Sequence, residues 1–310
     1  MKPKQKKLVA AVTGASGLVG RCIVNKLLES GWGIKALTRS DSFPDIQDVS
    51  IVKGDINDKA ALQELLAGVD AVFHCVAELY DEAIMRDVNV TGVKTLLSLL
   101  PLSSVRYFCY ISSAGVIGPT KEQVITEETL CHPFNEYEKT KYEAEKLVVS
   151  SKLRTRICIL RPTNVIGDTK KGVLRLPLRD NWRDRLTCFF KGKEGAHIIH
   201  AEDVAAASVF FINKPILKPE IFIISCDEDC QNTLSGVYSL VLKYLGKKNK
   251  NCYVSLPVII PYLLRYLFKG ASLHGNSRFS SQKIRNAGFT FSLGLERAVK
   301  DVCEQSKAKF

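Results

Sequence analysis

The sequence predicts an α/β fold built on a doubly wound parallel sheet. Three observations favour this fold class. A glycine-rich turn follows the first apolar run, short apolar runs alternate with helical stretches along the chain, and polar residues stand where the apolar runs end. Strands that alternate with helices are joined by right-handed crossovers, which make the sheet parallel and place helices on both of its faces.

The first expected element is a strand at residues 8–12, and it is followed by a turn that contains Gly14, Gly17 and Gly20. In such a turn the first glycine permits the tight bend, the second lets the backbone approach a pyrophosphate, and the third lets the next helix pack closely. We expect that helix at residues 18–29, with its positive end toward the phosphates. A strand before the turn and a helix after it favour a Rossmann-type dinucleotide site over a simple connecting loop.

The second expected strand ends at "ALTRS", residues 36–40. An acidic residue at this point would hold the ribose hydroxyls of NAD, whereas an arginine accommodates the 2′-phosphate of NADP. Arg39 therefore favours NADP over NAD, and a solvated arginine beside the adenine is the alternative.

The alternation continues through four more expected strands and two helices between them. The strands are expected at residues 49–55, 70–78, 105–118 and 156–167, and the helices at 61–69 and 88–100. Ligands of doubly wound sheets bind at the carboxyl ends of the strands. The polar residues at those ends, and therefore at the expected binding edge, are Asp55, His74, Ser113 and Asn164.

The stretch "NEYEKTKYEAEK", residues 135–146, places Tyr137 four residues before Lys141 in an expected helix, so that both share a face. A nearby ammonium stabilises a phenolate and lowers the tyrosine pKa, which is about 10 in the free residue. The hydroxyl of Ser113 could hold the same substrate oxygen during proton transfer, as hydride exchange with a nicotinamide requires. The alternative is a tyrosine on a charged helix face, with a lysine that pairs with Glu138 or Glu145.

Size and composition are those of a folded globular chain. The 310 residues are 46% hydrophobic and 25% charged, which suits one large domain or two joined ones. No apolar run approaches the roughly 20 residues that cross a bilayer, and the apolar stretch behind the basic start is too short for a signal peptide. We therefore expect a cytoplasmic protein without a transmembrane segment.

The formal net charge of +12 favours anionic partners. The basic residues are spread along the chain without a nucleic-acid-binding signature, so the phosphates of a small molecule are a better interpretation than nucleic acid. Most of the ten cysteines lie in apolar runs and show no zinc-like spacing. We expect reduced, buried thiols and no metal site.

The order TGxxGxxG, strand-end serine and YxxxK resembles the extended short-chain dehydrogenase/reductases, in particular the NAD-dependent epimerase/dehydratase family of nucleotide-sugar enzymes. "SSAGVIG" is similar to that family's SSxxVYG segment and places its serine at Ser113, and "RPTNVIG" resembles its RPxNVYG strand. "HIIHAEDVAAA" and "SSQKIRNAGF" resemble later segments, so the resemblance covers nearly the whole chain. Ile117 and Ile166 stand where the family has tyrosines, and "HCVAE" replaces HxAA.

The resemblance implies a catalytic set of Ser113, Tyr137 and Lys141 and a bound NADP or NAD. The histidines are then expected to orient the structure rather than to transfer protons. The implied cofactor-binding residues lie in the turn, at the strand ends and on two helices: Gly14, Ser16, Gly17, Leu18, Val19, Gly20, Arg39, Asp55, Ile56, Val76, Ala77, Asn89, Tyr137, Lys141, Pro162, Asn164 and Val165.

The resemblance also implies a domain organisation. We expect a dinucleotide-binding domain at residues 1–167, to which 196–224 return, and a smaller substrate-binding part at 168–195 and 225–310. Helices around Asn89 and Tyr137 form a dimer interface in many relatives, so a homodimer is expected by analogy.

Two stretches of the smaller part carry features of their own. Residues 168–195 are rich in arginine, and the guanidinium fork suits a diphosphate; a solvated basic loop is the alternative. Residues 254–270 are strongly apolar, and we expect them to pack in a core, with peripheral contact to an anionic bilayer as the alternative. The expected substrate-binding residues are Ser113, Asn164, Arg175, Arg179 and Arg183, with Arg185 as a further candidate.

The resulting hypothesis is an NAD(P)-dependent nucleotide-sugar epimerase/dehydratase or 4-keto-sugar reductase with a tyrosine acid/base. A second hypothesis is an NADP-dependent reductase of the hydroxysteroid or dihydroflavonol type, because "ALTRS" and "SSAG" also resemble those enzymes. A third is a dinucleotide-sensing protein that binds the cofactor without catalysis. Tyr137 and Lys141 are both retained, which favours an enzyme.

Overall fold

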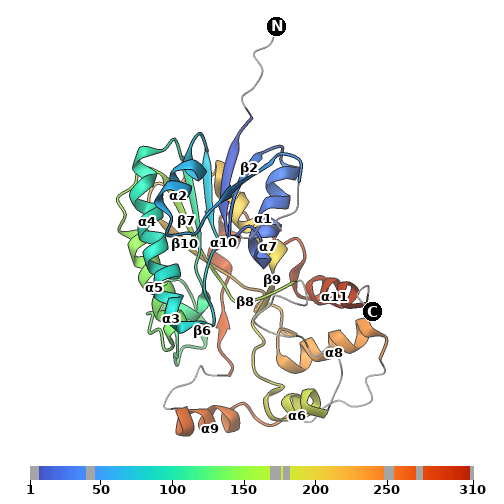
Figure 1. Cartoon of the computed structure of the whole chain (residues 1–310). Helices are drawn as coiled ribbons and strands as arrows, with labels where there is room; N and C mark the ends of the chain where they lie inside the picture. Colours follow the sequence, from blue (N-terminus) through green and yellow to red (C-terminus); the bar gives the residue numbers. More distant parts are fainter. Residues whose placement is uncertain are drawn as a thin grey trace. The chain divides into compact units, whose positions relative to one another are not determined.

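A computed structural model describes residues 7–39, 46–167, 176, 182–247, 255–269 and 275–307 of the chain (Figure 1). The described residues fall into two compact units. The first lies within Met1–Val116, Asn135–Arg161 and Ala205–Ile221, and the second within Ile117–Phe134, Pro162–Val204 and Phe222–Phe310.

The chain forms a seven-stranded sheet in the order β10-β7-β5-β4-β1-β2-β3, and most of its strands belong to the first unit. Strand β1 lies between β2 and β4 and is parallel to both, so the strand order reverses beside it. This reversal creates the ligand-binding edge of a doubly wound sheet, and it confirms the predicted fold class. The strands are β1 (Val9–Thr13), β2 (Gly33–Thr38), β3 (Val49–Lys53), β4 (Ala71–His74), β5 (Tyr107–Ile111), β7 (Arg156–Pro162) and β10 (Glu220–Ile224).

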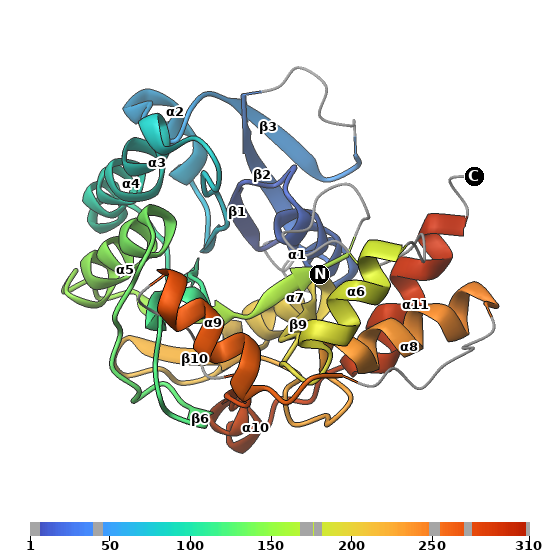
Figure 2. The same ribbon diagram turned by 90° about the horizontal axis from the view of Figure 1, so that it is seen from below.

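Helices cover both faces of the sheet (Figures 1 and 2). Helices α2 (Lys59–Leu66), α4 (Gly92–Leu99) and α5 (Glu136–Val149) share one core with one face. In that core Leu62, Leu96 and Val148 pack against Val72 and Phe108 of the buried strands. The other face carries α1 (Leu18–Glu29) and α7 (Ala201–Phe210). Apolar side chains at helical spacing on one side and buried strands on the other explain this layering.

Four expected strands end earlier than the sequence indicated, and the first of them, β3, stops at Lys53. Strand β4 stops at His74, and β5 stops at Ile111 before a 3-10 turn at Ala114–Ile117. The apolar run at 156–167 divides at Pro162, because proline has no N–H to continue the ladder. Its second part, β8 (Asn164–Ile166), pairs with β9 (Ile198–His200) in a separate sheet. Continuous hydrophobicity therefore overestimated the length of these strands.

The helix expected at 88–100 is composite. A short helix α3 (Glu82–Arg86) leads into a π-helical turn (Asp87–Thr91), then into α4, and a 3-10 turn at Leu100–Leu102 ends it. Gly92 lies against Ile56, where a Cβ would come within 2.8 Å of the isoleucine side chain. This close contact positions the helix over the end of β3.

The second unit contains two small sheets and five helices among its described residues. Besides β8 and β9, strand β6 (Val124–Ile125) pairs with β11 (Arg278–Phe279). Large apolar side chains of α9 are exposed, so the expectation that residues 254–270 pack in a core is wrong for this helix. The helices are α6 (Trp182–Lys191), α8 (Leu234–Leu245), α9 (Ile259–Lys269), α10 (Gln282–Asn286) and α11 (Gly294–Lys307).

Nine cysteines belong to the described residues, and all of them are free thiols. Burial raises the pKa of Cys188 and Cys303 to about 11, which keeps these sulfurs protonated. No group of three histidine, cysteine, aspartate or glutamate side chains in the described part could hold a metal ion. Within the same residues no helix has the length and apolar character needed to cross a membrane.

Candidate active site

The glycine turn between β1 and α1 has the geometry that a phosphate-binding loop needs. Gly14 has a φ of +68°, and a Cβ there would lie 2.7 Å from the backbone nitrogen of Val76. A Cβ on Gly20 would lie 2.1 Å from the carbonyl oxygen of Gly14, so the helix can approach only because Gly20 has no side chain. Both positions thus require glycine for the reasons expected from the sequence.

The N-terminus of α1 is suited to an anion. Gly17 is its N-cap and makes no side-chain cap hydrogen bond, and the first turn contains no acidic residue. The N–H groups of a helix start point outward with a partial positive charge. The residues of this turn therefore fit a pyrophosphate, and Leu18, Val19 and Gly20 lie in the first helical turn as expected.

The adenosine end of the expected site carries charges of both signs. Arg39 follows β2, and its guanidinium lies 3.7 Å from the carboxylate of Asp55, which follows β3. Hydrogen bonds from the N–H groups of residues 79–81, together with the charge of Arg39, lower the pKa of Glu78. Ile56 is buried. The sequence did not show that two carboxylates would lie near Arg39.

Asn89 is buried, and its side chain makes hydrogen bonds to other residues of the protein. Its amide oxygen accepts a hydrogen bond from the Glu78 backbone at 2.8 Å, and its amide nitrogen donates to the Glu78 carbonyl and to the Thr140 hydroxyl. Asn89 thereby ties the segment after β4, which contains Val76 and Ala77, to helix α5. Asn89 therefore holds in place the segment that contains two of the expected cofactor-binding residues.

His74 closes β4 and shares a hydrogen bond of 2.8 Å with the hydroxyl of Thr13 at the end of β1. Its ring stacks on Tyr110. Burial, assisted by the charge of Lys141, lowers the pKa of His74 to about 3, so the ring is neutral. His200 is also paired, since its ring accepts a hydrogen bond from the Glu202 backbone.

Ser113 and Tyr137 meet in the first unit. Ser113 follows β5, where its hydroxyl accepts a hydrogen bond from the Gly115 backbone at 3.1 Å. Tyr137 is the second residue of α5, which starts with a capping box formed by Asn135 and Glu138. Burial raises the pKa of Tyr137 to about 12, and a hydrogen bond with Ser113 opposes the increase. At neutral pH the phenol is therefore protonated.

Lys141 lies one turn further along α5 and is buried. Its ammonium donates a hydrogen bond of 2.7 Å to the Ile111 carbonyl and lies 4.3 Å from the centre of the Tyr110 ring. Burial lowers the pKa of Lys141 to about 7, against the opposing effect of the Glu145 carboxylate. The sequence led us to expect a lowered pKa for Tyr137 beside this ammonium. Burial instead raises the pKa of the phenol and lowers that of the amine.

A buried ion pair beneath Lys141 is the feature that sequence reasoning did not assign. Glu145 accepts hydrogen bonds from the Ser112 hydroxyl at 2.7 Å and from the Arg161 guanidinium at 2.5 Å. All three side chains are buried. Sequence spacing relates Glu145 to Lys141, one four-residue step earlier on the helix, but it does not relate Glu145 to Arg161 of β7.

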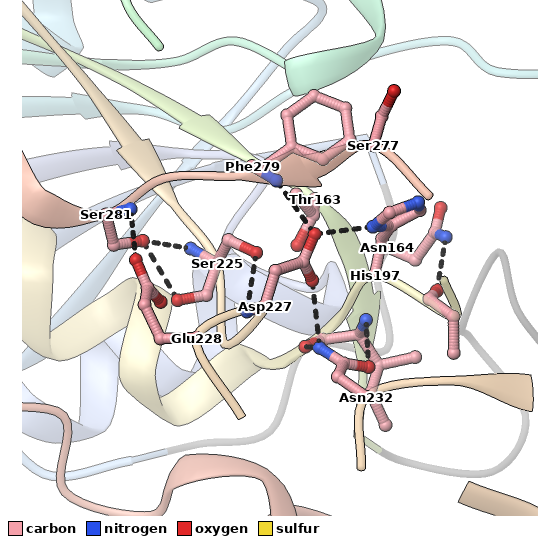
Figure 3. Close-up of polar contacts among 12 residues, drawn as sticks. Thr163, Asn164, His197, Ser225, Asp227, Glu228, Asn232, Ser277, Phe279 and Ser281 are labelled. Atoms are coloured by element: carbon pink, nitrogen blue, oxygen red, sulfur yellow. Dashed lines mark hydrogen bonds and ion pairs between the residues drawn. The ribbon is translucent and has the colours of Figure 1, made fainter. Parts of the chain in front are cut away.

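Asn164 and its neighbours lie in the second unit within a polar network that Figure 3 shows. The backbone N–H of Asn164 donates to the His197 carbonyl at 2.8 Å, and its side-chain amide donates to the Ala196 carbonyl at 2.9 Å. The carboxylate of Asp227 is 2.5 Å from His197 Nδ1, and it accepts hydrogen bonds from the Asn232 amide and the Phe279 backbone. This network holds the segment from Pro162 to Val165 in place.

Of the arginines expected to bind the substrate, some lie outside the residues that the structure describes. Arg175 and Arg179 lie outside the described residues. Arg183 is exposed on α6, with its guanidinium 5.5 Å from the ring of Trp182. Its contact with a substrate stays a prediction.

The first unit, with a glycine turn after β1 and a serine, tyrosine and lysine at β5 and α5, has a Rossmann-type fold. The NAD dependent epimerase/dehydratase family matches residues 10–225. The chain belongs to this family of extended short-chain dehydrogenase/reductases, which confirms the resemblance seen in its motifs.

Two individual relatives match this chain over shorter stretches than the family does. The chain is 34% identical over 173 residues to the N-acetyl-alpha-D-glucosaminyl-diphospho-ditrans,octacis-undecaprenol 4-epimerase of Escherichia coli O157:H7, covering 51% of this chain and 49% of that protein. It is 34% identical over 190 residues to the 3 beta-hydroxysteroid dehydrogenase/Delta 5-->4-isomerase of monkeypox virus, covering 53% and 54%. The chain thus matches about half the length of these two relatives.

A solved structure shows the same fold along nearly the whole chain. UDP-glucose 4-epimerase of Thermotoga maritima, solved with UDP-glucose, covers 97% of this chain and 99% of its own, with a TM-score of 0.75 and 19% identity. At this identity the likeness establishes the fold, including the presence of both units.

Proposed function

We propose that the protein is an NAD(P)-dependent epimerase, dehydratase or keto-reductase that acts on a nucleotide sugar. The observation that carries the proposal is the hydrogen bond between Ser113 and Tyr137, on the helix that bears Lys141 and in the unit that contains the glycine turn. A bound nicotinamide would supply or accept the hydride. The sugar substrate is supported by the family and by the fold of UDP-glucose 4-epimerase.

The protein's own groups would handle the proton. Ser113 would hold the substrate oxygen by a hydrogen bond, and Tyr137 would exchange a proton with that oxygen. A phenol with a pKa of about 12 is protonated at neutral pH, so it is prepared to donate a proton to a carbonyl oxygen. Lys141, with a pKa of about 7, would supply a positive charge near the dinucleotide below that pH.

The choice between the two dinucleotides and the location of the substrate-binding region are proposed from the sequence. Arg39 favours NADP over NAD, and the region from 168 to 195 would contribute to substrate binding. We also propose a homodimer formed through helices around Asn89 and Tyr137, by analogy with the family. The proposed domain organisation remains residues 1–167, with 196–224 returning to that domain, beside the smaller part at 168–195 and 225–310.

Substitution of the tyrosine tests this function. The parent protein is incubated with UDP-, GDP- and dTDP-sugars and either dinucleotide, and reduced cofactor and epimerised sugar are measured. We expect Tyr137→Phe to bind cofactor normally and to lower turnover by at least about a hundredfold, the usual contribution of acid–base catalysis. Tyr142→Phe, on the same helix, is the matched control and should retain turnover. Undiminished activity in Tyr137→Phe would leave only a cofactor-binding role.

A second candidate function is oxidation or reduction of a sterol-like or lipid-borne alcohol. The exposed apolar side chains of α9 favour it, because a nucleotide sugar offers them no partner. The relatives named for a lipid-linked sugar and for a hydroxysteroid support it. A 3β-hydroxysteroid and an undecaprenyl-diphospho-sugar, added to the same substrate panel, distinguish the two candidates.

A further inference from the structure

The second unit carries an exposed apolar surface that a nucleotide-sugar reaction at Tyr137 does not use. We define this α6–α9 surface by Trp182, Phe189 and Phe190 of α6 and Leu263, Leu267 and Phe268 of α9. Trp182 is 68% exposed, Leu267 77% and Phe268 85%. Clusters of large exposed apolar side chains are uncommon on soluble proteins and usually mark an interaction surface.

The orientation of α9 is fixed by contacts on its inner side. Arg265 makes an ion pair of 2.8 Å with Glu194, and Pro261 is buried. At 100° per residue, Leu263 and Leu267 lie on the opposite side of the helix from these two. The outward direction of Leu263 and Leu267 is therefore a consequence of how the helix is attached. Phe268, near the end of the helix, lies on the same side as Pro261 by this spacing and is nevertheless 85% exposed.

Helix α6 lies, like α9, at the lower end of the second unit in Figure 1, and it is attached by apolar packing rather than by an ion pair. Cys188 is buried with Tyr238 and Leu242 of α8, whereas Trp182 and Phe189 are exposed. The two helices are also linked, since the backbone N–H of Leu256, just before α9, donates to the Phe189 carbonyl at 2.9 Å. The segment before α9 therefore passes α6, and both helices expose apolar side chains in the second unit.

The charges on this surface have one predominant sign. Residues 182–193, "WRDRLTCFFKGK", contain four basic residues and one acidic residue, and residues 255–269 contain no acidic residue. Lys191 and Lys193 are exposed beside the aromatic side chains. Helices that combine aromatic and aliphatic side chains with lysine and arginine are typical of segments that lie in the headgroup region of a membrane.

We propose that the α6–α9 surface docks on an anionic lipid bilayer, with both helices in the plane of the headgroups. The apolar side chains would enter the boundary between headgroups and acyl chains, and the lysines would contact lipid phosphates. A second copy of this chain would bring the same positive charges face to face, whereas an anionic bilayer neutralises them. This surface would place the enzyme at a membrane that no helix of its described part crosses.

Vesicle co-sedimentation with the full-length protein tests the proposal. Vesicles of phosphatidylcholine alone are compared with vesicles that also contain phosphatidylglycerol. We expect binding to the anionic vesicles that is weakened by salt. Lys191→Glu/Lys193→Glu should weaken it by at least about tenfold, since each basic residue near the surface contributes about fivefold. Leu267→Asp/Phe268→Asp should weaken it by at least about tenfold as well, because two large apolar groups leave the interface.

Leu217→Asp is the matched control, because Leu217 is 99% exposed and lies outside the α6–α9 surface. It should bind vesicles like the parent. Absence of binding to anionic vesicles, or unchanged binding by Leu267→Asp/Phe268→Asp, would refute the proposal. So would a parent dimer that this double variant converts to monomer, since the surface would then be a protein interface. Vesicle binding by Tyr137→Phe should equal that of the parent, so the outcome is independent of the proposed catalysis.

Discussion

Glu145 is the residue whose contacts link three elements beneath the candidate site. Its carboxylate joins Ser112 after β5 and Arg161 of β7 to helix α5. Loss of one partner of a buried ion pair leaves the other charge uncompensated, which costs about 3–5 kcal/mol. We therefore predict that Glu145→Gln lowers the free energy of unfolding by that amount in urea titrations.

The double variant Glu145→Met/Arg161→Met removes both charges together. It should be more stable than Glu145→Gln, because an apolar pair of similar volume leaves no buried charge. Glu143→Gln, on the exposed side of the same helix, is the control and should change stability by less than about 1 kcal/mol. A small effect of Glu145→Gln would show that water compensates Arg161.

Arg39 decides between the two dinucleotides if its guanidinium binds the 2′-phosphate. Hydrogen bonds to charged groups contribute about 1.5–3 kcal/mol, which corresponds to roughly a ten- to hundredfold change in Kd. We predict that Arg39→Ala weakens NADP binding by at least about tenfold and changes NAD binding by less than about threefold, as measured by calorimetry. Equal losses for both dinucleotides would place the side chain beside the adenine.

At the scale of elements, the start of α5 determines the position of Tyr137. Asn135 accepts a hydrogen bond of 2.9 Å from the Glu138 backbone, and Glu138 reaches back to the Asn135 backbone. Replacement of such a cap by alanine costs about 1 kcal/mol. We predict that Asn135→Ala lowers stability by that amount and also lowers turnover, because the first turn of the helix frays around Tyr137.

A second helix of the same unit provides the control. Asp58 caps α2 by accepting hydrogen bonds from the backbone of Ala60 and Ala61. Asp58→Ala should reduce stability to a similar extent without the loss of turnover. Equal turnover in both variants would mean that Tyr137 is held by its burial rather than by the cap.

The elements also show which parts of the fold the sequence could predict. Helix α1 has the expected bounds, Leu18–Glu29, because an amphipathic pattern and a glycine turn act locally. The end of β5 was missed because Ala114, Val116 and Ile117 are apolar and buried in a 3-10 turn. Hydrophobicity reports burial, whereas hydrogen-bond partners decide where a strand ends.

The same distinction applies to the site. Gly14, Tyr137 and Lys141 could be proposed as site residues because short spacings carry their geometry. Glu145 and Arg161 are 16 residues apart and meet only once β7 is in the sheet, so no local pattern could pair them. Local sequence likewise could not show that burial would dominate the pKa of Tyr137.

At the scale of the whole molecule, the exposed face of α9 and the site in the first unit need different explanations. The family and the fold account for the site, since they extend over most of the chain. Neither accounts for an amphipathic helix whose apolar side faces outward. A sequence can show that α9 is apolar, but only its attachment through Arg265 and Pro261 shows which side is buried.

The stability of the folded protein should depend on pH through His74. Its pKa is about 3 in the folded protein and about 6.5 in an unfolded chain. Below pH 6.5 the unfolded state binds a proton that the folded state does not. The free energy of unfolding should therefore decrease as the pH falls from about 6.5 toward 3, by up to about 1.4 kcal/mol per pH unit.

Other groups also titrate in this range, so the measured quantity is a difference between proteins. His74→Asn lacks the titrating ring, and the parent's stability relative to it should decline with decreasing pH in urea titrations between pH 7 and about 4. His132→Asn, at an exposed histidine, is the control for the substitution itself. A difference between parent and His74→Asn that stays constant with pH would mean that the buried ring binds its proton as readily as a solvated one.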